Sequence, residues 1–244
     1  MAEHGMTEQE FQKLLIKENN LMLFKKDGKE IFILGTIHHF HLIEASNYSL
    51  AQAASVIKTI KPDILLIEAR QETLEKHNAV DGPIEMIFAR SYAAEQNLLV
   101  KGIDWWKVIK DNAAKERMDA QRDDRILDNI LSAAENHNRA LALMGASHRE
   151  RMPERFLKKG YVKVEIDDIP GYFNNADIPF RYPEGMKEEA CRSNKYYQTV
   201  FLQELNQNLN PDDELYEMFF ELTRPSESWR KMHDMINEHR LFKS

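Results

Sequence analysis

Two histidines in this 244-residue chain follow the same local pattern, in which an apolar run ends in Gly-x-x-His. The first pattern, "FILGTIH", ends at His38, and the second, "LALMGASH", ends at His148. An imidazole can bind a metal ion or act as a general base near neutral pH. A glycine at the end of a strand permits a tight turn and leaves room above the sheet. The pattern therefore predicts two histidines at the carboxyl edge of a sheet, where open α/β sheets bind their ligands.

Each Gly-x-x-His precedes a predicted helix and then a predicted strand that ends in a carboxylate. After His38 that strand is "DILLIEA", which contains Glu68, and after His148 it is "YVKVEID", which contains Glu165. The pattern indicates two degenerate β-GxxH-α-β units. Two such units side by side would direct both histidines into one crevice, with Glu68 at the end of a neighbouring strand. Glu165 is a less favoured candidate for a second functional carboxylate.

His39 and His41 have no counterpart in the second unit, so we expect them to be bystanders. They do have the His-x-His spacing that follows a strand in metallo-β-lactamases and amidohydrolases. Those enzymes also need an aspartate and further histidines at set distances, whereas Leu-Ile-Glu follows here. We therefore do not expect a metal site built on this pair.

Arg122 and Asn129 interrupt the apolar stripe of a long predicted helix. With Ile126 and Ala133 they fall at i, i+4, i+7 and i+11, on one face of an α-helix. Polar side chains on a buried face lose hydration unless they find partners. A carboxylate such as Glu68 would suit Arg122, and a purely structural buried network is the alternative.

The predicted elements alternate between strand and helix, which indicates an α/β fold with a central, mostly parallel sheet and flanking helices. We expect this core to span residues 1–169. Residues 170–244 begin with a proline-rich loop and are expected to form a helical C-terminal extension packed on the core. Strands are expected at about 21–26, 29–35, 63–69, 98–104, 140–145 and 161–167, and helices at about 50–60, 84–92, 113–137 and 150–160.

The composition argues against several classes of protein. A net charge of −7 does not suit a nucleic-acid binder that relies on a strong positive field. The longest apolar runs fall short of the about 18 residues that a membrane span needs. The N-terminal residues lack the pattern of a signal peptide, and the single cysteine, Cys191, cannot form an intrachain disulfide. These features predict a soluble cytoplasmic protein.

The order of the motifs resembles the TraB/Tiki superfamily, which includes erythromycin esterase-like and ChaN-like proteins. That family has paired GxxH motifs, a glutamate at the end of the strand after the first motif, and an arginine-bearing helix between the two. Here "LGTIH", "KPDILLIEAR", "GID", "QRDDRILDNI" and "LMGASHRERM" occur in the same order. The resemblance covers about residues 20–168 and does not extend to the tail.

The resemblance implies a hydrolase site that acts on a peptide or a small-molecule ester. In one mechanism the site binds a divalent Zn, Mn or Co ion that activates water. In the other there is no metal, and a histidine poised by the glutamate acts as general base. A non-catalytic member would bind a peptide or, less favoured, a haem in the same crevice. The implied catalytic residues are His38, Glu68, His148, Arg70 and Arg122, with His38, Glu68 and His148 as metal ligands and Asp104 and Asn129 as supporting residues.

Several candidates also have a purely structural interpretation. Glu68 could simply pair with Arg70 or Arg122 at the end of its strand. Asp104 could cap a following helix, and the two tryptophans after it are expected to line the core or a pocket wall. Sequence alone leaves these alternatives open.

Overall fold

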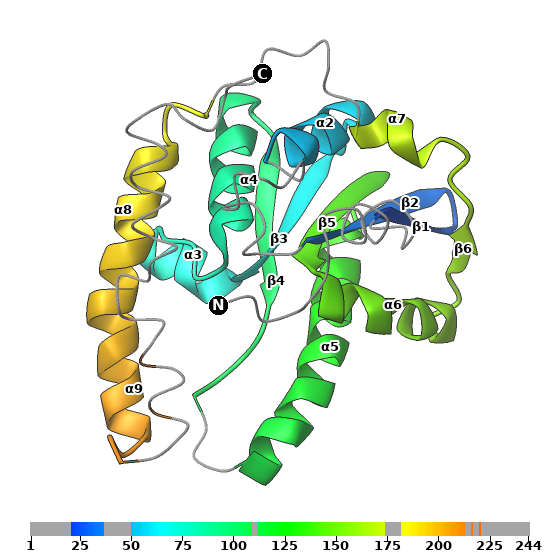
Figure 1. Cartoon of the computed structure of the whole chain (residues 1–244). Helices are drawn as coiled ribbons and strands as arrows, with labels where there is room; N and C mark the ends of the chain where they lie inside the picture. Colours follow the sequence, from blue (N-terminus) through cyan, green and yellow to red (C-terminus); the bar gives the residue numbers. More distant parts are fainter. Residues whose placement is uncertain are drawn as a thin grey trace, which may run out of the picture.

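The computed structural model describes residues 21–36, 50–108, 112–173 and 182–212, with residues 216 and 220, and only the backbone of residues 112–120. These residues form a six-stranded sheet with helices on both faces, which confirms the predicted α/β fold (Figure 1). In chain order the elements are β1 (Leu21–Lys26), β2 (Lys29–Thr36), α2 (Leu50–Ile60), β3 (Ile64–Arg70), α3 (Gln71–His77), α4 (Ile84–Glu95), β4 (Leu99–Asp104), α5 (Asn112–Ala134), β5 (Arg139–Gly145), α6 (Ala146–Lys158), β6 (Val162–Val164), α7 (Ile169–Phe173), α8 (Met186–Tyr196), η2 (Tyr197–Phe201) and α9 (Leu202–Asn208).

The sheet has the strand order β4-β3-β5-β2-β1-β6, and its four strands from β4 to β2 run parallel. The two strands that carry the Gly-x-x-His glycines, β2 and β5, are direct neighbours. Gly35 pairs with Met144 and Thr36 with Gly145, so both motifs leave the sheet at the same edge. Both motif strands end at one edge of the sheet, as predicted, and they are in addition direct neighbours.

The similarity of the two units ends at the strand that follows each motif. β3 lies parallel to β5 in the middle of the sheet, whereas β6 pairs antiparallel with β1 at the edge opposite β4. The β1–β2 hairpin causes this difference, because its turn at Asp27 and Gly28, both with positive φ, folds β1 back onto the free edge of β2. Three strands therefore separate β6 from β3, and Glu165 does not occupy a position equivalent to that of Glu68.

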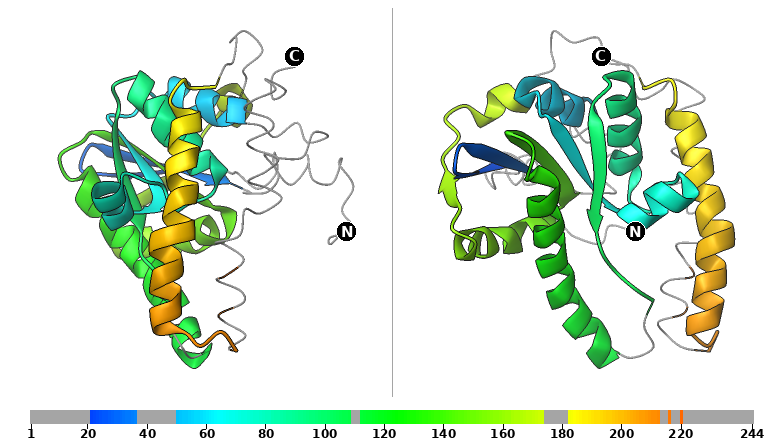
Figure 2. Two further views of the ribbon diagram at one scale, coloured as in Figure 1. Left: turned by 90° about the vertical axis from the view of Figure 1, so that its left-hand side faces the viewer. Right: turned by 180° about the vertical axis from the view of Figure 1, so that it is seen from behind.

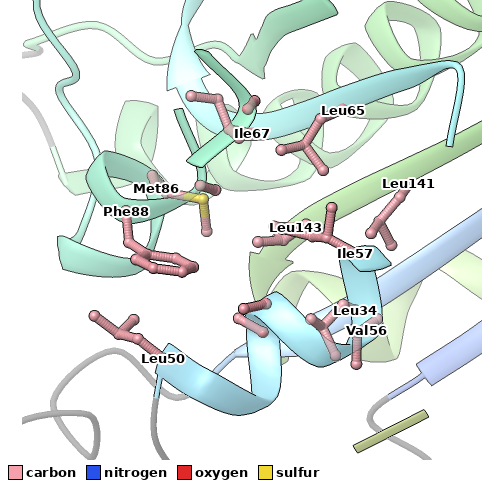
Figure 3. Packing of buried hydrophobic residues seen from close by; sticks show 14 of the residues in the cluster. Leu34, Leu50, Val56, Ile57, Leu65, Ile67, Met86, Phe88, Leu141 and Leu143 are labelled. Carbon is pink, nitrogen blue, oxygen red and sulfur yellow. The ribbon is translucent and has the colours of Figure 1, made fainter. Parts of the chain in front are cut away.

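Helices cover both faces of the sheet, which explains why the parallel strands are continuously apolar. On one face α2 and α4 pack against alternate strand residues, among them Leu65, Ile67 and Leu143 (Figure 3). On the other face α5 and α6 pack against the intervening residues, such as Leu66 and Met144. Because strand side chains alternate, Glu68 follows Leu66 onto the face that α5 and α6 cover.

Residues 186–208 continue through α8, η2 and α9 as one helical rod that lies beside α3 and α4 (Figures 1 and 2). Arg90 of α4 donates to Glu189 of the rod at 2.6 Å, and the Val80 backbone N–H donates to Ser193 Oγ at 2.9 Å. The rod is thus fastened to the α4 side of the core by polar as well as apolar contacts. Of the helices in the described ranges, none is both long enough and apolar enough to cross a membrane.

Candidate functional site

Glu68, near the carboxyl end of β3, is the centre of the candidate site. Its carboxylate is 5% exposed and receives contacts from three other elements. The backbone N–H of Gly145, at the end of β5, donates to Oε2, and Arg122 Nη2 of α5 donates to Oε1 at 3.2 Å. His148 Nε2, in the first turn of α6, lies 3.5 Å from the same Oε1. The predicted proximity of Glu68 to Arg122 and to His148 is therefore present.

Arg122 is held in place by Asp104 at the end of β4. Nε donates to Oδ1 at 2.8 Å and Nη2 to Oδ2 at 2.7 Å, which is the two-pronged geometry of a strong guanidinium–carboxylate pair. Asp104 Oδ1 also accepts from the backbone N–H of Trp105 at 2.7 Å. Residues 105–108 are not helical, so Asp104 orients Arg122 and a local turn and does not cap a helix that directly follows.

His148 is buried, and its second ring nitrogen faces Asp123 of α5. Nδ1 lies 2.6 Å from Asp123 Oδ1, and Arg151 donates to both oxygens of the same carboxylate. Burial would raise the pKa of Asp123, but its hydrogen bonds with His148 and Arg151 outweigh that effect and lower the pKa to about 2. Asp123 was not among the predicted site residues. The available signal was the i, i+3 spacing of His148 and Arg151, which places both on the side of α6 that meets α5.

Arg70, predicted as a catalytic candidate, contacts a different group of side chains. Its Nε donates to Asp81 Oδ2 at 2.5 Å and its Nη2 donates to the Tyr196 hydroxyl at 2.6 Å. The guanidinium also stacks 4.0 Å from the centre of the Trp106 ring. The β3–β4 pairing shifts register between Ile67 and Arg70, at the point where Arg70 turns toward these partners. These contacts favour a structural role, in which Arg70 ties β3 to the C-terminal rod.

Asn129, predicted as a supporting residue, lies about two helical turns beyond Arg122 on α5 and contacts the backbone of β4. Its Nδ2 donates to the carbonyl oxygen of Ile103 at 2.9 Å. This bond fastens α5 to β4 directly before Asp104, which supports the structural alternative for Asn129.

His38, the third predicted metal ligand, falls outside the described residues, as do His39 and His41. Thr36, the last residue of β2, precedes His38 by two positions. Thr36 Oγ1 lies 2.7 Å from Oε1 of Glu85, a fully buried carboxylate in the first turn of α4. Sequence reasoning missed Glu85. Its signal was an acidic residue two positions after Pro83, in the first turn of a helix, where the helix dipole favours negative charge.

The glycine of the first Gly-x-x-His has a packing role that the structure makes visible. A Cβ atom on Gly35 would lie 2.6 Å from Arg149 Cδ, so the absence of a side chain makes room for the buried stem of that arginine. Arg149 is 3% exposed and comes from the first turns of α6, next to His148. Gly35 of the first motif thus makes room for Arg149, the residue directly after the second motif.

Two of the three predicted metal ligands lie together, namely Glu68 and His148. Within the described ranges, no group of three or more histidine, cysteine, aspartate and glutamate side chains is arranged to hold a metal ion. The donor types do fit a divalent ion, because an imidazole nitrogen and a carboxylate oxygen are common ligands of Zn²⁺ and Mn²⁺. A third ligand from this chain would have to come from beyond those ranges, and His38 is the predicted one.

Comparison of the chain with protein-family models, with curated proteins and with solved structures gave no match. The resemblance to the TraB/Tiki superfamily therefore stays a prediction, and functional inference starts from the geometry of Glu68 and its neighbours.

Proposed function

We propose that the chain is a hydrolase of peptide or ester bonds in which Glu68, His148 and His38 hold a divalent metal ion. One observation carries the proposal: His148 Nε2 and Glu68 Oε1 lie 3.5 Å apart. Two ligand atoms on a tetrahedral ion with bonds of about 2.1 Å are separated by about 3.4 Å. The two side chains are thus already spaced as neighbouring ligands of one ion.

The other contacts of the site fit the same proposal. A bound divalent ion would lower the pKa of a water molecule and polarise the carbonyl group of the substrate. Arg122 places a guanidinium beside Glu68, where it would stabilise negative charge that develops on the substrate. Asp104 keeps that guanidinium in one orientation through two hydrogen bonds, so little reorganisation is needed during the reaction.

A second candidate is hydrolysis without a metal, and the contact between Arg122 Nη2 and Glu68 Oε1 at 3.2 Å favours it. This guanidinium, which also pairs with Asp104, offsets part of the charge of the Glu68 carboxylate and so lessens the need for a metal cation. One of the two motif histidines would then remove a proton from water as general base. The substrate would be an ester or a lactone, because these are easier to cleave than amides.

Metal content after incubation with Zn²⁺, Mn²⁺ and Co²⁺ distinguishes the two candidates. We expect about one equivalent of metal in the wild type and a loss of metal in both Glu68→Gln and His148→Gln. Asp128→Asn is a matched control, because Asp128 lies on the same helix and pairs at the surface with Lys159 at 3.0 Å. Absence of metal from the wild type would overturn the metal-assisted proposal. Ester hydrolysis that persists in EDTA and is lost in His148→Gln would then support the second candidate.

A further inference from the structure

We infer that Asp123 is a positioning residue, which keeps a proton on Nδ1 of His148 and leaves Nε2, the nitrogen nearer to Glu68, as the one that can bind a metal ion. The inference rests on the proposed function, in which Nε2 is the atom that binds the metal ion. Asp123 acts on the site through the imidazole of His148, whose Nδ1 lies 2.6 Å from it.

The hydrogen bonds of Asp123 locate the proton. His148 Nδ1 and Asp123 Oδ1 are 2.6 Å apart, a separation that requires a proton between them. Arg151 donates through Nε to Oδ2 and through Nη2 to Oδ1, the latter at 3.1 Å. Two hydrogen bonds from the guanidinium of Arg151 favour the ionised form of the Asp123 carboxylate, in which both oxygens act as acceptors. The proton therefore belongs to Nδ1.

The distance of 3.2 Å between Arg151 Nη2 and His148 Nδ1 suggests an alternative in which Nδ1 accepts from the arginine. In that arrangement two acceptors, Nδ1 and Asp123 Oδ1, would face each other at 2.6 Å without a proton between them. Such a contact is repulsive and would leave a buried acceptor without a donor. His148 and Arg151 lie close together because both donate to the same carboxylate oxygen.

Asp123 lies where α5 and α6 pack together. Arg155 donates to Asp124 at 2.7 Å, and Lys159 donates to Asp128 at 3.0 Å, at the exposed rim of the same contact. Asp123 itself is buried and reaches the ring nitrogen that points away from Glu68. A carboxylate on the far nitrogen of a metal-binding histidine fixes its tautomer and orientation and raises its basicity.

The tautomer of His148 can be measured directly on the full chain without metal. Long-range ¹H–¹⁵N correlation spectra of histidine-labelled protein separate the two tautomers, and His148→Gln identifies the signal among the nine histidines. At a pH where one ring proton remains, we expect that proton on Nδ1. A wild-type spectrum with the proton on Nε2 would overturn the inference, even if no Asp123 variant can be folded.

Two variants test whether Asp123 sets the tautomer of His148. Asp123→Ala is expected to shift the His148 population toward the tautomer that carries its proton on Nε2. The matched control, Asp124→Ala, removes the next carboxylate on the same helix, which pairs with Arg155 instead of His148, and should leave the spectrum unchanged. An unchanged tautomer in a folded Asp123→Ala variant would contradict the role of Asp123.

Metal titration separates this inference from the proposed function. We expect Asp123→Asn to weaken metal affinity by about 10- to 100-fold, with the same stoichiometry at saturation. A wild type that binds no metal but shows the proton on Nδ1 would remove the proposed function and keep Asp123 as the residue that orients His148. A wild type that binds metal through His148 but shows the proton on Nε2 would keep the proposed function and overturn the role of Asp123.

Discussion

The backbone N–H of Gly145, the residue directly before α6, donates to the Glu68 carboxylate, so that a side chain from β3 is bound at the N-terminal end of α6. This bond joins the glycine of the second Gly-x-x-His to the predicted metal-binding glutamate. A carboxylate is stabilising at a helix N-terminus, and here it also faces Arg122 and His148. Glu68 therefore has a structural role in addition to its proposed chemical one.

The two roles of Glu68 can be separated by two substitutions. Glu68→Gln retains an oxygen for the Gly145 N–H but removes the charge, whereas Glu68→Ala removes both. We expect Glu68→Ala to lower the free energy of unfolding by about 3 kcal/mol and Glu68→Gln by about 1 to 2 kcal/mol, because only the former leaves a buried donor unpaired. Urea unfolding followed by circular dichroism measures both. If the two variants were equally destabilised, the hydrogen bond from Gly145 would contribute nothing to stability, and the charge of Glu68 would account for the whole effect.

Arg122→Lys tests the two-pronged pair with Asp104. A lysine keeps the positive charge beside Glu68 but cannot form two parallel hydrogen bonds to Asp104. We expect a loss of about 1 to 2 kcal/mol in the free energy of unfolding, again by urea titration. Arg139→Lys is the control, because Arg139 pairs with Glu30 at the surface and should change stability by no more than about 0.5 kcal/mol. If Arg122→Lys lowered the free energy of unfolding as little as the control does, the two hydrogen bonds from Arg122 to Asp104 would contribute little to stability.

The sequence was informative where a pattern repeats or a strand is continuously apolar. Gly35 and Gly145 end similar apolar strands, and that similarity predicted strands that emerge at one edge. The direct pairing of β2 with β5 was not predictable in this way. It requires the connection through α2 to leave a gap between β2 and β3 that β5 then fills, which is a long-range property of the topology. The failed equivalence of Glu165 has the same origin. The hairpin turn at Asp27 and Gly28 places β1 beside β2, but no local feature shows that β6 then pairs with β1.

Spacing in the sequence also could not show whether Arg70 or Arg122 contacts Glu68. Arg70 is two residues from Glu68 in the same strand, and Arg122 is on a distant helix, yet Arg122 makes the contact. The register shift after Ile67 and the buried partners Asp81 and Tyr196 turn Arg70 away. Asp123 was missed for a related reason, because its contact with His148 exists only once α5 and α6 pack on the same face.

The lowered pKa of Asp123 predicts a component of acid sensitivity. A carboxyl group whose folded pKa of about 2 lies below its ordinary value of 3.8 stabilises the fold at pH values above 3.8. That contribution, about 2 kcal/mol, is lost as the pH falls from about 3.8 toward 2. We therefore expect the difference in unfolding free energy between the wild type and Asp123→Asn to shrink as the pH is lowered through this range.

Urea titrations between pH 6 and pH 2.5 measure this difference for both proteins. Asp124→Asn serves as the control, because its carboxylate is exposed and pairs with Arg155 at the surface. The control should show little pH-dependent difference from the wild type. A constant difference between the wild type and Asp123→Asn across the range would mean that Asp123 does not hold a lowered pKa in the folded state.

Gly35→Ala tests the contact between the two motifs. The new methyl group would meet the stem of Arg149 at 2.6 Å, so the buried arginine next to His148 must shift. We expect the free energy of unfolding to fall by about 1 to 3 kcal/mol from overpacking, and metal binding at Glu68 and His148 to weaken with it. Gly185→Ala is the matched control, because no atom lies within 4 Å of its added Cβ and its φ of −78° suits any residue. If Gly35→Ala proved as stable as the control, with unchanged metal affinity, the glycine of the first motif would have no packing role toward the second.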